Sequence, residues 1–126
     1  MLIDVESLYN LVQGHAQVHA FFHTYVGATL AALALIAAFW LLRRAGLAWL
    51  LGLTLHRVTI GALLGAWSHV VLDSVMHADI QPLLPFSADN GLWRIVSLAT
   101  LHGACVAAGV LGLVVLGVRR LMAARS

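Results

Sequence analysis

The sequence is poor in charge and in cysteine, and each shortage excludes a class of protein. Only 10% of its 126 residues are charged while 62% are hydrophobic, a balance far from that of a soluble domain. The single cysteine, Cys105, excludes a disulfide framework within one chain. Lysine is absent, so all seven basic residues are arginine. The length fits one domain, and the composition places that domain in a lipid bilayer.

The apolar residues gather in segments that are long enough to cross a membrane. A helix needs about 20 mostly apolar residues to span a hydrocarbon core of roughly 30 Å. The sequence therefore predicts an all-α integral membrane bundle, a single transmembrane domain over 1–126. Its expected parts are an N-terminal interfacial helix at 1–20, span one at 23–43, span two at 58–78, an outer loop at 79–91 and span three at 92–118. The segment 47–55 is too short to cross alone, and is either a short surface helix or the start of span two.

The N-terminal segment has the pattern of a helix that lies at the membrane interface. Residues 2–13 alternate apolar and polar side chains at helical spacing. No basic region precedes the first span, and no small-residue cleavage motif follows it before Arg43. We therefore expect that span one is retained and is not a removable signal peptide.

The charges separate onto two sides of the predicted bundle. Six arginines flank the same ends of the three spans, and Arg94 alone lies on the other side. The acids all fall on that other side: Asp4, Glu6, Asp73, Asp79 and Asp89. Because arginine favours cytoplasmic loops, this placement predicts an inner-membrane protein with its N-terminus outside and its C-terminus in the cytoplasm. The lipid bilayer is the expected partner, and nucleic acid is not, because the arginines sit at helix ends.

A stripe of small and ionisable residues runs along span two. Gly61, Gly65, His69, Asp73 and His77 follow one another at intervals of four, so they share one face of a helix. The glycines are typical of close helix packing. A central Asp costs about 2.5 to 3.5 kcal/mol on insertion scales and usually marks function, and a metal cation is its simplest counter-ion. His69 and His77 lie about 12 Å apart along the axis, so one ion could use Asp73 with either histidine, or two ions could share Asp73 as a bridge.

Histidines on the other predicted helices reach a similar depth. His19 and His23 repeat the four-residue spacing just before span one, and His102 lies in span three. Measured along the helix axis from the arginine end of each helix, His23, Asp73 and His102 all lie at a distance of about 24 to 30 Å. The predicted metal ligands are therefore His19, His23, His69, Asp73, His77 and His102.

Imidazole and carboxylate ligands without thiolate suit zinc first, with manganese, iron or nickel as alternatives. The sequence predicts one or two such divalent ions. A catalytic site would keep one position open to water. Asp73 would then act as a ligand or bridge, and an unligated histidine, His69 or His102, would serve as general base or acid.

Part of the chain resembles a known family. The run Ser68-His69 with Asp73, followed by Pro85-Phe86, is similar to the Ser-His-x-x-x-Asp segment and Pro-Phe loop of the membrane-bound metal-dependent hydrolase family, small YdjM-like proteins of the inner membrane. His23-Thr24 resembles the end of that family's His-Arg-Gly-x-x-His-Ser/Thr motif. The likeness covers about half the chain. It implies a metal-dependent hydrolase, which we expect to act near the outer membrane face on a lipid-linked phosphoester.

The chain also departs from that family pattern. Val18-His19-Ala20 stands where the family has His-Arg-Gly, and Met76-His77 stands where Thr-Pro is common. The aspartate-rich motif of longer members is absent. Loss of an acidic ligand motif could leave a binding site without turnover.

Two other functions fit the same residues. A haem-binding electron-transfer subunit could take axial ligands from His23, His69 and His102, although a haem pocket does not need the carboxylate of Asp73. A non-catalytic subunit could use the stripe as a metal site or proton relay within a larger assembly. Three spans make a thin bundle with little interior, so a homo-oligomer is a possible partner arrangement.

Overall fold

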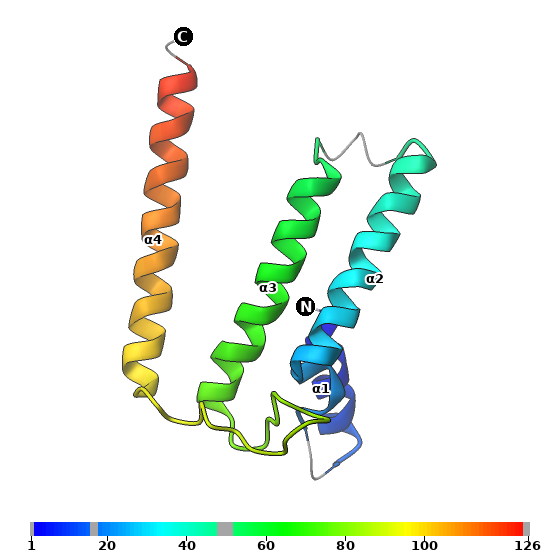
Figure 1. Ribbon diagram of the computed structural model, residues 1–126. Coiled ribbons are helices and arrows are strands. Elements are labelled where there is room, and N and C mark those ends of the chain that lie inside the picture. Colours follow the sequence, from blue (N-terminus) through cyan, green and yellow to red (C-terminus); the bar gives the residue numbers. More distant parts are fainter. Residues whose placement is uncertain (1, 16–17, 48–51, 125–126) are drawn as a thin grey trace. The chain divides into compact units, whose positions relative to one another are not determined.

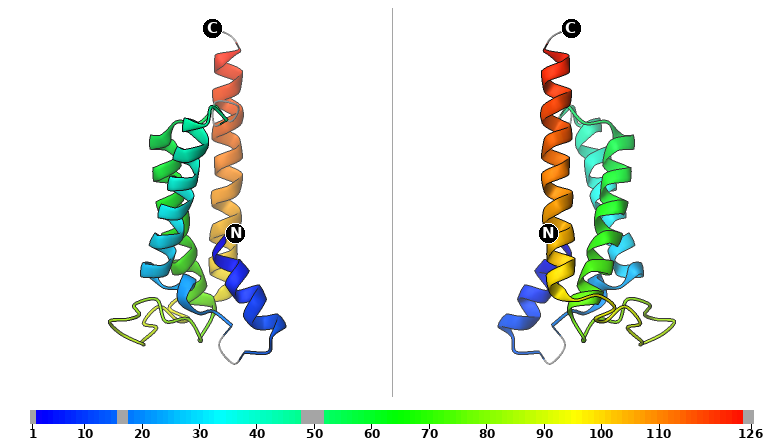
Figure 2. Two further views of the ribbon diagram at one scale, coloured as in Figure 1. Left: turned by 90° about the vertical axis from the view of Figure 1, so that its right-hand side faces the viewer. Right: turned by 90° about the vertical axis from the view of Figure 1, so that its left-hand side faces the viewer.

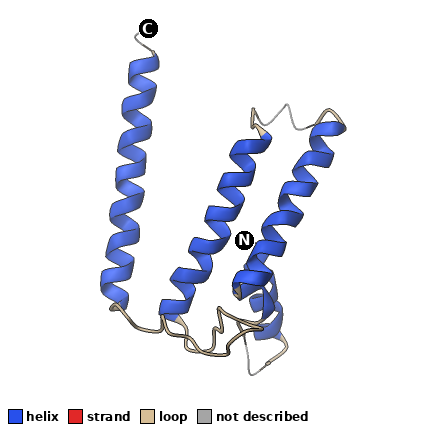
Figure 3. Cartoon of the chain, viewed as in Figure 1, coloured by secondary structure: helices blue, strands red, loops and turns tan. Residues whose placement is uncertain are grey.

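The computed structural model describes residues 2–15, 18–47 and 52–124, and within them all regular secondary structure is helical. This confirms the all-α class. The elements in chain order are α1 (Leu2–Val12), the short 3-10 turn η1 (Phe21–His23), α2 (Tyr25–Arg44), α3 (Leu55–Met76) and α4 (Leu98–Ala123) (Figure 3).

Three of these helices, α2, α3 and α4, are long and apolar enough to cross a membrane. The mean hydropathy of α3 is 1.4, against 2.1 for α2 and 2.2 for α4, because α3 carries the ionisable residues of the stripe. Helix α3 begins at Leu55, so the end of the segment 47–55 belongs to it, while residues 48–51 lie outside the described residues. Helix α4 begins at Leu98, where the hydroxyl of Ser97 accepts a hydrogen bond from the Thr100 N–H at 3.1 Å.

The chain divides into two compact units, residues 1–93 and 94–126. The second unit consists of α4 with its flanking residues. In the first unit, α2 and α3 run side by side in opposite directions (Figure 1). Helix α1 lies near the start of α2 and the end of α3 (Figures 1 and 2). Small side chains make this pairing close: Ala28, Ala32, Ala66 and Val70 form the buried core.

The turn η1 is folded tightly against the first turn of α2. The Thr24 hydroxyl donates a hydrogen bond to the Phe21 carbonyl at 2.8 Å and accepts one from the Gly27 N–H at 2.9 Å. A Cβ at position 27 would collide with the Phe21 carbonyl, so only glycine permits this approach. The tight turn fixes the direction of His23, which is 1% exposed.

Helix α1 turns its polar side toward the rest of the first unit. The Glu6 carboxylate accepts a hydrogen bond from the Phe22 N–H at 2.7 Å, and the Asn10 amide donates to the Val18 carbonyl at 3.2 Å. Large apolar side chains of α1 are 60% exposed or more: Val5, Leu8, Tyr9, Leu11 and Val12. This is the orientation expected of a helix that lies in lipid, where the protein interior is the more polar side.

Hydrogen bonds hold the loop after α3 against the start of α2 and the end of α3. The Pro82 carbonyl accepts a hydrogen bond from the Tyr25 N–H at 2.9 Å. The Asn90 amide donates to the carbonyls of Ser74 at 2.9 Å and His77 at 3.1 Å. Ile80 is fully buried beneath this loop segment. The loop therefore holds the residues that follow α3 against the segment that precedes α2.

Candidate metal site

Four side chains from three elements converge at the loop end of the first unit, and we call them the core cluster: Asp4 of α1, His23 of η1, and His69 and Asp73 of α3. The Nε2 atom of His69 lies 3.0 Å from Oδ1 of Asp4 and 3.2 Å from Oδ2 of Asp73. The Nε2 atom of His23 lies 3.5 Å from Oδ2 of Asp73 and 3.9 Å from Oδ1 of Asp4. Two imidazoles thus face the same pair of carboxylates.

The orientation of these rings would allow both to bind one metal ion. The Nε2 atoms of His23 and His69 are both buried, and neither forms a hydrogen bond within the described residues despite the nearby carboxylates. Donor atoms that bind one tetrahedral ion at about 2.0 to 2.1 Å lie about 3.3 to 3.4 Å from one another. The observed spacings of 3.0 to 3.9 Å surround that value. The donor set therefore fits a divalent ion placed between the four side chains.

The surrounding structure fixes these ligands and leaves one side open. The Ser7 hydroxyl lies 3.5 Å from Nδ1 of His23, the nitrogen on the far side of the ring from the cluster. Such outer contacts orient a ligating imidazole. The side chains of His23, His69 and Asp73 are 1%, 16% and 13% exposed, whereas that of Asp4 is 44% exposed. Access to the core cluster is therefore from the side of α1.

A second group, which we call the loop cluster, consists of His19, His77 and Asp79. The Nδ1 atom of His19 lies 3.1 and 3.0 Å from the two carboxylate oxygens of Asp79, and the His19 backbone N–H donates to Oδ2 at 3.2 Å. The His77 ring lies against the His19 ring, with 4.3 Å between centroids. Partial burial raises the pKa of Asp79, but the hydrogen bonds from His19 outweigh this effect and hold the pKa below its ordinary value of 3.8. Asp79 therefore carries its charge at neutral pH.

The two clusters adjoin one another through their imidazole rings. The His19 and His23 ring centroids are 4.9 Å apart, and those of His23 and His69 are 5.4 Å apart. With His77 beside His19, four rings form a row from the exposed loop to the buried end of α3. All of these residues belong to the first unit.

The structure distributes the predicted ligands between the two clusters. His23, His69 and Asp73 come together in the core cluster, while His19 and His77 join the loop cluster. The stripe divides because α3 ends at Met76, so His77 takes an extended backbone conformation and leaves the helical face. The sequence left open whether Asp73 pairs with His69, pairs with His77 or bridges two ions, and in the structure Asp73 lies with His69, while His77 lies with His19 and Asp79. His102 lies on α4 in the second unit, and its role as a ligand stays a prediction.

Sequence reasoning missed two acids, Asp4 and Asp79. Asp4 was expected on the polar side of an interfacial helix, and Asp79 in a loop. No spacing rule connects them with their partners, since His19 and Asp79 are 60 residues apart in the chain. The one available signal was the charge asymmetry, because every acid lies on the half of the bundle that carries most of the histidines.

The fold and the two clusters define a small helical membrane protein with histidine and aspartate gathered at one end of its spans. A family model described as YdjM inner membrane protein matches residues 3–125, so the chain belongs to this family of inner-membrane proteins. The match confirms the resemblance seen in half of the sequence and extends it over nearly all of it. No curated protein and no solved structure matches the chain.

Proposed function

We propose that the core cluster binds one divalent transition metal ion, with zinc as the first candidate, and that the protein is a metal-dependent hydrolase. The observation that carries this proposal is the pair of buried Nε2 atoms, on His23 and His69, that face two carboxylates without a hydrogen bond. Two carboxylates in direct reach of both imidazoles suit a hard or borderline divalent ion better than haem iron.

Some residues of the core cluster would bind the ion, and another would lie where a substrate enters. A bound divalent ion supplies Lewis-acid chemistry, which polarises a phosphoryl or carbonyl oxygen and makes water nucleophilic at neutral pH. Asp73 and His69 would hold the ion from one helix, and His69 would act as a ligand because its Nε2 faces both carboxylates. Asp4 is the most exposed member, so water and substrate approach beside it.

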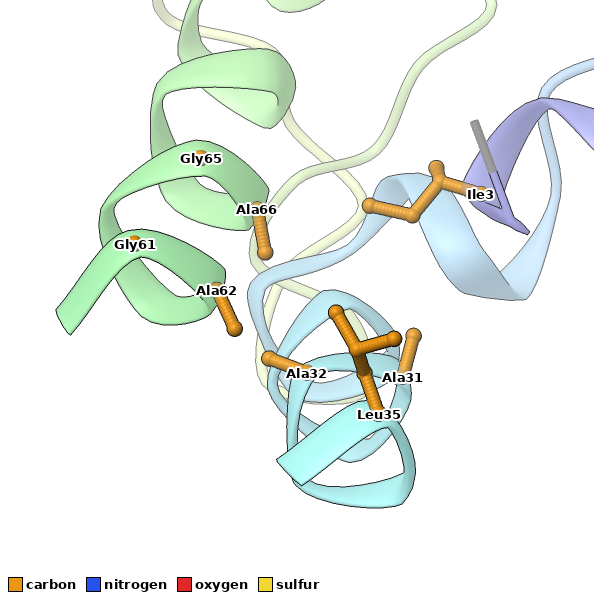
Figure 4. A pocket seen from close by; sticks show the side chains of 8 residues that line it. All are labelled: Ile3, Ala31, Ala32, Leu35, Gly61, Ala62, Gly65 and Ala66. Atoms are coloured by element: carbon orange, nitrogen blue, oxygen red, sulfur yellow. The ribbon is translucent and has the colours of Figure 1, made fainter. Parts of the chain in front are cut away.

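An apolar cavity next to the core cluster supports a lipid-linked phosphoester as substrate. The cavity has a volume of about 380 Å³ and lies between α1, α2 and α3 (Figure 4). Its lining is entirely apolar: Ile3, Ala31, Ala32, Leu35, Gly61, Ala62, Gly65 and Ala66. Ile3 is next to Asp4 in sequence, and Gly65 lies one helical turn from His69. An acyl chain in this cavity would bring the attached ester to the core cluster.

Hydrolysis by the purified protein tests the proposal. In nanodiscs with zinc, we expect release of phosphate from a lipid phosphoester, and much slower release from a water-soluble phosphate ester that has no acyl chain. Removal of the ion with a chelator should lower the rate by more than about a hundredfold, because loss of an outer-shell partner alone typically costs 10- to 100-fold. Added zinc should restore it.

The variant Asp89→Asn is the matched control, because Asp89 lies on the same predicted side of the bundle and, within the described residues, hydrogen-bonds only with Ser87. It should hydrolyse the lipid at the wild-type rate. If fully zinc-loaded wild type hydrolysed neither ester, the enzyme assignment would be abandoned in favour of a non-catalytic metal-binding subunit.

We further propose that the loop end of the spans faces the outside and the arginine-rich end faces the cytoplasm. The charge asymmetry supports this orientation. In a Cys105→Ser background, Phe86→Cys should react with a membrane-impermeant maleimide on intact cells, since Phe86 is 87% exposed in the loop. Ala45→Cys, at the exposed end of α2, should react only after the cells are permeabilised. The reverse pattern would invert the topology.

A further inference from the structure

The loop cluster contains a complete set of metal donors that the core cluster does not use. The donor atoms of His19, His77 and Asp79 all lie within 4.8 Å of one another. Two imidazoles and one carboxylate are a donor set that commonly binds zinc while leaving a coordination position for water. We propose that the loop cluster is a second metal site, which binds its own divalent transition metal ion beside the core cluster.

Backbone contacts outside the cluster hold the segment that carries His77 and Asp79. The His77 N–H donates to the Asp73 carbonyl at 2.8 Å, and the His77 carbonyl accepts from Asn90 at 3.1 Å. The hydrogen bond from the Tyr25 N–H to the Pro82 carbonyl holds the loop beside the start of α2. Because backbone contacts position the donors, little ordering is required when an ion binds.

A simple ion pair between His19 and Asp79 would not explain the position of His77. Within the described residues, the His77 ring forms no hydrogen bond, yet it lies 4.3 Å from the His19 ring at an interplanar angle of 32°. The His19 ring already has a carboxylate partner in Asp79. A cation bound by all three side chains accounts for the convergence of the second imidazole on this pair.

The two sites differ in their exposure to water, and this difference predicts their relative affinities. His77 is exposed and the Asp79 side chain is 36% exposed, whereas His23 in the core cluster is 1% exposed. The loop cluster also supplies three donors where the core cluster supplies four. We therefore expect the loop ion to bind more weakly and to exchange faster with solvent. The proposal does not depend on whether the core cluster is catalytic.

Zinc titration of the purified full-length chain in mild detergent tests the second site. Wild type should bind two zinc ions in two steps of different affinity. Asp79→Asn should lower the zinc affinity of the weaker step by at least tenfold and leave the affinity of the tighter step unchanged. His77→Ala should have the same effect, and it keeps the pair of His19 and Asp79 intact, so it serves even if Asp79→Asn disturbs the loop.

Controls separate this proposal from the proposed function. Asp89→Asn, in the same loop, should bind two ions like wild type. A single ion in wild type that survives both His77→Ala and Asp79→Asn would overturn the second site and leave the core cluster standing. Two ions that both survive these substitutions would overturn it as well. Loss of the tighter step in these two variants, with the weaker step kept, would instead overturn the predicted order of the two affinities.

Discussion

The variant Asp73→Asn is expected to bind the core ion at least about a hundredfold more weakly than wild type. Oδ2 of Asp73 lies 3.2 Å from Nε2 of His69 and 3.5 Å from Nε2 of His23, so both imidazoles are close to this carboxylate. Asparagine keeps the shape of the side chain but removes its charge. Loss of a ligand should cost more than loss of an outer-shell partner, for which 10- to 100-fold is typical.

Competition with a chelator of known affinity measures this effect directly. Because Asp73 is absent from the loop cluster, the weaker zinc step should persist in Asp73→Asn, and its persistence shows that the variant is folded. Asp79→Asn provides the reciprocal control, with the tight step intact. An unchanged tight step in Asp73→Asn would show that the ion binds elsewhere in the protein.

The long helices could be predicted from the sequence because lipid imposes a simple requirement. A spanning segment must be apolar over about 20 residues, and α2, α3 and α4 satisfy this. The pairing of His69 with Asp73 was equally accessible, since both lie on one helix at four-residue spacing. The part of the site contained within one helix was therefore predictable.

The remainder of the site depends on contacts that no local pattern encodes. Asp4 reaches the core cluster because α1 turns its polar side toward the protein, and an amphipathic pattern alone does not say which side faces lipid. His77 leaves the stripe because α3 ends one residue earlier. Asp79 meets His19 only because the loop folds back over 60 residues of chain. Each of these positions requires the tertiary structure.

The position of α1 links the metal ion to the stability of the first unit. Polar side chains of α1 contact the protein through Glu6 and Asn10 at backbone partners and through Asp4 at the core cluster. Ile3 is its one described apolar side chain that is fully buried. In the core cluster, the donor oxygens of Asp4 and Asp73 lie within 4.8 Å of one another, beside the same two imidazoles. An ion bound there would link α1 to α3 through these two carboxylates.

Helix α1 is therefore expected to dock on the first unit in a metal-dependent way. With 11 residues it is too short to be a stable helix on its own. Binding to the docked state stabilises it by about 2.7 kcal/mol when zinc is present at about 100 times its dissociation constant, which corresponds to about a hundredfold. Hydrogen exchange of residues 2–12 should accelerate by up to this factor after chelation, while exchange in the middle of α3 changes little.

The variant Asp4→Asn distinguishes docking by the ion from docking by the other polar contacts. It removes the charged ligand that α1 supplies, and it leaves the contacts of Glu6 and Asn10 in place. Exchange of α1 should then be nearly the same with and without zinc. If α1 of wild type exchanged equally fast in both conditions while the tight zinc step was occupied, Asp4 would not be a ligand. The core cluster would then consist of His23, His69 and Asp73 alone.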